Sequence, residues 1–73
     1  MAAHYPGGGR VTETILKEAE RLVKRTPHPI KYQAEQEFEK AHSRYRLGDN
    51  IGAFKAAYKA ISIAEEAGRT AKR

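Results

Sequence analysis

Residues 34–64 read AEQEFEKAHSRYRLGDNIGAFKAAYKAISIA, and the fold depends on this stretch more than on any other. Its middle, Leu47-Gly48-Asp49-Asn50, has the composition of a turn between two helices. Gly48 is suited to the left-handed conformation that ends a helix, and either Asp49 or Asn50 is suited to cap the next one. Because the connection is so short, we expect the two flanking helices to pack as antiparallel neighbours.

The segment before this turn has the apolar spacing of a helix that runs over residues 29–47. Its apolar side chains recur every three or four positions, which places them on one helical face. Pro29 suits the first turn of such a helix, where a missing N–H leaves no hydrogen bond unmade. The face comprises Ile30, Ala34, Phe38, Ala41 and Tyr45.

A further helix is predicted upstream, over residues 12–25. Thr12 is a suitable N-cap, and Val11 before it is placed to pack against Leu16. The stretch Thr26-Pro27-His28-Pro29 should end this helix, because a residue that precedes proline avoids the helical conformation. The apolar face of this helix comprises Ile15, Leu16, Ala19, Leu22 and Val23.

The segment after the turn predicts a third helix over residues 50–67, which Gly68 should end. This helix has more apolar surface than one face needs, so it should be covered on more than one side. One explanation places it between the other two helices. The alternative packs its bulky residues inside and leaves its small residues for a helix of another chain. The bulky residues are Ile51, Phe54, Tyr58 and Ile61, and the candidate docking residues are Ala53, Ala56, Ala60, Ile63 and Ala67.

Together these patterns predict an all-α fold, a three-helix up-down bundle over residues 11–68. Residues 1–10 should form a flexible tail, because three successive glycines at positions 7–9 favour an open backbone. A phosphate-binding glycine loop is disfavoured there, since no strand precedes the glycines and no Gly-Lys-Ser/Thr follows them. Residues 69–73 are expected to form a basic C-terminal tail.

Composition excludes several classes of protein. The chain has 73 residues with 14 Lys+Arg, 9 Asp+Glu, a net charge of +5 and no Cys. Without Cys there is neither a disulfide scaffold nor a thiolate metal site. No apolar run approaches the roughly 20 residues of a membrane span, and no secretory signal pattern is present, so we expect a cytoplasmic protein. A chain this small builds a thin core, which favours a partner or self-association.

The hairpin of residues 34–64 resembles a single tetratricopeptide-repeat hairpin. The resemblance rests on Gly48-Asp49 at the turn, on Ala53 five positions after Gly48, and on Ala60-Ile61 further along. Three-helix microtubule-interacting-and-trafficking domains carry a similar Gly-Asp-x-x-x-Ala hairpin. Both resemblances imply that a helix or peptide binds in a groove and that the protein is no enzyme. Neither resemblance assigns binding residues, because the ligand-contacting positions of those families are not matched here.

Catalytic and metal-binding patterns are weak in this chain. Glu39 and His42 form one Glu-x-x-His on a predicted helix, whereas a di-iron bundle needs two such motifs and two more glutamates. No spacing suggests a Ser/His/Asp group, and a Cys nucleophile is lacking. We therefore expect no enzymatic activity, no cofactor and no metal, with Glu39 and His42 on a solvated face.

Two functions remain as predictions. The first is a non-catalytic protein–protein interaction module, an adaptor or a homo-oligomer, that docks a partner helix on the third helix. The second is a small basic nucleic-acid-binding protein that contacts phosphates, because the third helix carries lysines and alanines in place of base-reading side chains. Both would use an electrostatic rim, here called the basic rim, of Arg44, Arg46, Lys55 and Lys59.

Overall fold

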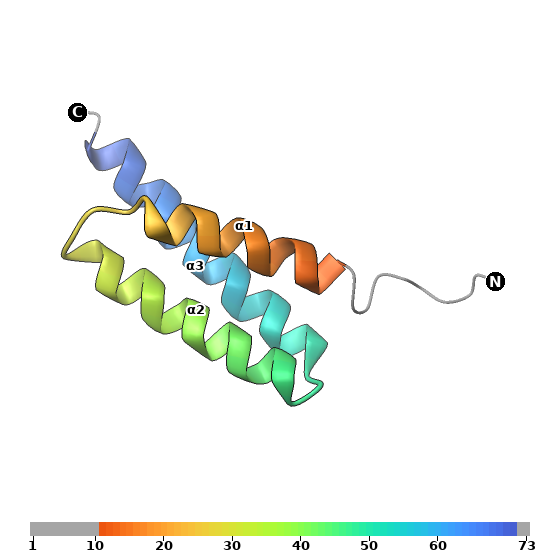
Figure 1. Cartoon of the computed structure of the whole chain (residues 1–73). Helices are drawn as coiled ribbons and strands as arrows, with labels where there is room; N and C mark the ends of the chain where they lie inside the picture. Colours follow the sequence, from red (N-terminus) through yellow and green to blue (C-terminus); the bar gives the residue numbers. More distant parts are fainter. Residues whose placement is uncertain (1–10, 72–73) are drawn as a thin grey trace.

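The computed structural model describes residues 11–71 as three α-helices in an up-down bundle (Figure 1). They are α1 (Thr12–Lys24), α2 (Ile30–Arg46) and α3 (Asn50–Ala71). Every pair of helices is in contact, which confirms the predicted all-α three-helix bundle. The tail predicted for residues 1–10 and the last two residues of the predicted basic tail lie outside the described residues.

The turn between α2 and α3 forms as its sequence predicts. Gly48 has a φ of +87°, the left-handed conformation that glycine adopts without strain. The backbone N–H of Asp49 donates to the carbonyl oxygen of Arg44 at 2.9 Å and closes the last turn of α2. The Oδ1 atom of Asp49 then accepts the backbone N–H of Gly52 at 2.8 Å, so Asp49 caps α3.

The proline-containing stretch between α1 and α2 separates the two helices. The hydroxyl of Thr26 is buried and donates to the carbonyl oxygen of Leu22 at 2.8 Å, which satisfies one carbonyl at the end of α1. Pro29 occupies the position just before α2, and the N–H of Lys31 donates to the carbonyl oxygen of Pro27 at 3.0 Å. The predicted break between these helices is confirmed.

Two helix ends differ from the prediction. Thr12 is the first residue of α1 and is buried, and the capping position belongs to Val11, which has helical backbone angles and no side-chain cap. Helix α3 continues through Gly68 to Ala71, so Gly68 does not end it. A glycine inside a helix costs only about 1 kcal/mol, and the ion pair of Arg69 with Glu66 at 2.6 Å spans Gly68.

Small side chains dominate the core where the helices meet. α3 packs extensively against both α1 and α2, whereas α1 and α2 contact each other less. Leu16, Val23 and Ile61 are the largest residues buried there, and alanines from all three helices surround them. The alanines without exposed surface are Ala19, Ala34, Ala41, Ala53, Ala57 and Ala60. The third helix therefore lies between the other two. This agrees with the first explanation given for its excess apolar surface.

Candidate protein-docking surface

The small face of α3 lies inside the bundle. Ala53 and Ala60 have no exposed surface, and Ala56 and Ala67 are also buried. Ile63 is half-buried and lines a hollow at the end of the hairpin. The prediction that the four alanines face a partner is therefore wrong, because their small size serves to bring α1 and α2 close to α3. For Ile63, which keeps exposed surface, it stays a prediction.

Three of the four bulky residues of α3 lie outside instead, whereas the fourth, Ile61, is buried in the core. Ile51 is 73% exposed, Tyr58 is 59% exposed and Phe54 is 36% exposed. Their spacing of three and then four positions places them on one face of the helix. The rings of Phe54 and Tyr58 are stacked, with centroids 6.5 Å apart and planes 7° apart. We call these three residues the α3 stripe. Its exposure is the reverse of the predicted placement for these three residues, and of the four bulky residues only Ile61 packs inside.

Helix α1 extends the α3 stripe into a larger apolar surface. Val11, Thr14 and Ile15 line a shallow hollow of about 330 Å³ together with Phe54. Val11 is 49% exposed, whereas Ile15 is half-buried. Stripe and hollow occupy the N-terminal halves of α1 and α3, where the sequence alone pointed to no combined surface. We call Val11, Ile15 and the α3 stripe the docking surface.

The cations nearest to the α3 stripe have no acidic partner in the described part of the chain. Lys55 and Lys59 are exposed, and within residues 11–71 no carboxylate forms an ion pair with either of them. The carboxylate of Asp49 caps α3. The next acids along α3 are Glu65 and Glu66, beyond the stripe. The exposed face of α3 is thus apolar and cationic in its first half.

The structure does not bring the basic rim together as one surface. All four of its residues are exposed, but Arg46 lines the groove between α1 and α2. Residues two positions apart on a helix do not share a face, so Arg44 points to a different side of α2 from Arg46. Lys55 and Lys59 each follow an aromatic residue of the stripe by one position, so they are the part of the rim that lies beside the docking surface.

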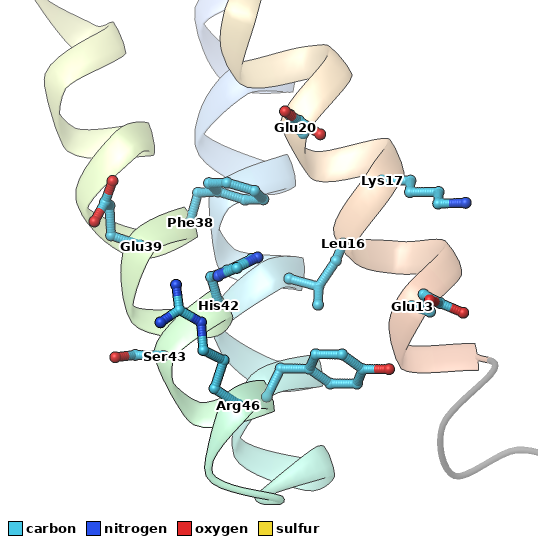
Figure 2. Close-up of a pocket in the computed structure, with 10 residues that line it drawn as sticks. Glu13, Leu16, Lys17, Glu20, Phe38, Glu39, His42, Ser43 and Arg46 are labelled. Carbon is cyan, nitrogen blue, oxygen red and sulfur yellow. The ribbon is translucent and has the colours of Figure 1, made fainter.

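A second hollow, of about 600 Å³, lies between α1 and α2. Figure 2 shows the rings of Phe38 and His42 pointing from α2 into this groove, and Leu16 pointing into it from α1. The two rings have centroids 6.0 Å apart. The sequence assigned Phe38 to a core face, but it stays half-buried because α1 packs mainly on α3. The rim of the groove mixes both charges, from Glu13, Lys17, Glu20, Glu39 and Arg46.

The groove between α1 and α2 shows no metal-binding cluster among its described residues. Glu39 and His42 both line it, but in the part of the chain that the structure describes no three His, Cys, Asp or Glu side chains gather to hold a metal ion. Outside the groove, a side-chain hydrogen bond from Arg21 to Glu18 raises the pKa of Arg21. Because arginine is always protonated in proteins, this shift gives no proton-transfer group.

Comparisons with protein-family models, with curated proteins and with solved structures find no match to this chain. The resemblance of residues 34–64 to a tetratricopeptide-repeat hairpin, or to a microtubule-interacting-and-trafficking domain, therefore stays a prediction. Among residues 11–71, none of the helices combines the length and the apolar character that crossing a membrane requires.

Proposed function

We propose that this protein is a non-catalytic protein–protein interaction module that docks a helix on the surface formed by Val11, Ile15 and the α3 stripe. The observation that carries this proposal is the exposure of Ile51, Phe54 and Tyr58 on one face. Contiguous exposed apolar patches mark interaction sites in soluble proteins, because burying them against a partner removes apolar area from water.

The shape of the surface favours a helix over a small molecule. Small-molecule sites are concave and enclose most of the ligand, whereas the hollow beside Phe54 is shallow and open. The α3 stripe is straight, since its residues follow one helical face. A partner helix meets such a stripe with apolar residues at matching intervals of three, four and seven positions. The partner can belong to a different protein, as for an adaptor, or to a second copy, as in a homo-oligomer.

A capture experiment from the native host tests this proposal. We expect wild-type protein to retain a set of partners that the Phe54→Glu/Tyr58→Glu variant loses. Tyr32→Glu is a matched control, because Tyr32 is an exposed aromatic residue, 63% exposed, on α2. Circular dichroism should show unchanged helix content in both variants. Equal capture by all three proteins would contradict the proposed docking surface.

Nucleic-acid binding is a second candidate, favoured by the net charge of +5 and by Lys55 and Lys59, which form no ion pair within residues 11–71. Binding of this kind depends on counterion release and should weaken steeply as salt rises. Titration with a mixed-sequence DNA duplex at about 50 mM salt tests it. Failure to bind under these conditions would remove this candidate. Binding that Lys55→Glu/Lys59→Glu abolishes and the uncharged variant Phe54→Gln/Tyr58→Gln leaves intact would favour it over helix docking.

A further inference from the structure

We infer that the partner helix is acidic along one edge, and that this edge lies beside Lys55 and Lys59 while its apolar residues cover the docking surface. The inference rests on the proposed function and names the chemistry of the partner. It follows from the length of the α3 stripe, from the side on which the lysines lie, and from the charges available to neutralise them.

The length of the α3 stripe sets how many partner residues it can take. Ile51 and Tyr58 are seven positions apart, which corresponds to two helical turns and about 10 Å. Two turns of a partner helix bring three apolar anchors to such a stripe, at positions i, i+3 or i+4, and i+7. The stacked rings of Phe54 and Tyr58 form the broad centre against which these anchors pack.

The two edges of the α3 stripe differ in chemistry. Phe54 reaches toward α1, where it shares the apolar hollow with Val11 and Ile15. Lys55 and Lys59 each follow an aromatic residue of the stripe by one position, which turns them about 100° around the helix, to the opposite edge. A docked helix therefore meets an apolar hollow along one edge and two ammonium groups along the other.

No described carboxylate neutralises the lysine edge. Lys40 pairs with Glu37 on α2, and Arg69 pairs with Glu66 near the end of α3, but neither Lys55 nor Lys59 belongs to an ion pair within residues 11–71. Docking an apolar helix beside them without a counter-charge would strip water from two ammonium groups. Aspartate or glutamate on the facing edge of the partner supplies hydrogen bonds that replace this water.

Charge also favours a different protein over a second copy of this chain. In a twofold dimer the same patch meets itself, so Lys55 and Lys59 of both copies would lie in one interface. Each copy would also bring a net charge of +5. Like charges brought together across an interface oppose association, whereas an acidic partner is attracted to the same surface.

A displayed library of helical peptides about 18 residues long tests the inference. Each peptide carries leucine at i, i+3 and i+7, and its flanking positions are randomised among Glu, Gln and Lys. The full chain serves as the target in three forms, namely wild type, Lys55→Glu/Lys59→Glu, and Phe54→Glu/Tyr58→Glu. Circular dichroism first establishes that both variants keep the helix content of the wild type.

With wild type we expect enrichment of Glu along one flank of the recovered peptides. With Lys55→Glu/Lys59→Glu this flank should switch to Lys, and with Phe54→Glu/Tyr58→Glu recovery should be lost. The affinity of the best peptide should fall at least about five-fold when the ionic strength rises from 50 to 300 mM, since exposed charge pairs are screened. An affinity that does not change with salt would count against the acidic edge.

The failures of the inference and of the proposed function are distinguishable. Peptides that need Phe54 and Tyr58 but show no acidic flank would overturn the inference and leave the proposed function standing. A dimer that is seen in sedimentation equilibrium and dissociates with Tyr58→Glu would assign the surface to a second copy. This result would also overturn the inference and leave the proposed function standing. If no recovered peptide depends on Phe54 or Tyr58, both the inference and the proposed function are overturned.

Discussion

Alanine sets how closely the three helices of this protein approach one another. Ala19 on α1, Ala34 and Ala41 on α2, and Ala57 and Ala60 on α3 have no exposed surface. A methyl group at each contact lets one backbone lie close to the next, and a longer side chain would force the helices apart. The positions on α3 that invite close packing are thus already occupied by neighbours within the same chain.

Replacing Ala60 by glutamate should unfold the protein. The new carboxylate would lie where Ala60 has no exposed surface and where no described cation is buried to pair with it. Burying an unpaired charge costs several kcal/mol, which is comparable to the whole stability of a small domain. Circular dichroism at 25 °C should show loss of most helical signal. The control variant Ser62→Glu, at an exposed position two residues further along α3, should keep the helical signal. An Ala60→Glu protein that stays folded would contradict the burial of Ala60.

Two glycine-to-alanine changes should have opposite effects on stability. Gly48 has a φ of +87°, so Gly48→Ala should lower the free energy of unfolding by about 1–2 kcal/mol. Gly68 lies inside α3 with open space around it, so Gly68→Ala should raise this free energy by about 0.5–1 kcal/mol. Urea denaturation measures both changes. Effects of the same sign would be inconsistent with the assigned backbone conformations.

At the scale of the helix, α3 has features that the sequence predicts and one, the direction of its apolar faces, that the sequence does not predict. The spacing of apolar residues predicts three helices, the Gly48 turn and the excess apolar surface of α3. The spacing does not indicate which apolar face of α3 is buried, because the small face and the bulky face both have helical periodicity. Large residues are usually the buried ones. Here Ala19, Ala34 and Ala41 on the neighbouring helices favour contact with the small face, and Ile51 and Tyr58 are left outside.

The start of α3 depends on Asp49, which resolves an alternative that the sequence leaves open. Asp49→Ala should remove the hydrogen bond to the N–H of Gly52 and lower the free energy of unfolding by about 1 kcal/mol. Asn50→Ala should lower the free energy of unfolding by less, because Asn50 is the first residue of α3 and does not occupy the capping position. Urea denaturation of the two variants checks the order, and a larger loss with Asn50→Ala would show that Asp49 is not the capping residue.

At the scale of the whole molecule, the core is thin because several large apolar side chains lie on the surface instead of inside. Among the residues described, no large side chain is fully buried, while Ile51, Phe54 and Tyr58 lie exposed on one face. The same residues that leave the isolated chain with a modest core are therefore available to a partner. A partner that binds only the folded protein stabilises it by mass action, by about 2.7 kcal/mol at 100 times its Kd.

The groove between α1 and α2 is the competing surface on this molecule. It is larger than the hollow beside Phe54, and it contains Phe38 and His42 (Figure 2). Its rim carries Glu13, Glu20 and Glu39 together with Lys17 and Arg46, so it favours neither an acidic nor a basic partner. The docking surface has two lysines beside its α3 stripe that form no ion pair within residues 11–71, and on this ground it is the better candidate for a selective interaction.

Backbone amide NMR of the full chain, titrated with the best acidic peptide from the library, shows directly whether the peptide binds the docking surface. Binding of the peptide at this surface should give the largest chemical-shift changes at residues 51–59 of α3, around Ile51, Phe54 and Tyr58, and at residues 11–15, at the start of α1. Largest changes at residues 38–46, around Phe38 and His42, with the α3 stripe unmoved, would contradict it.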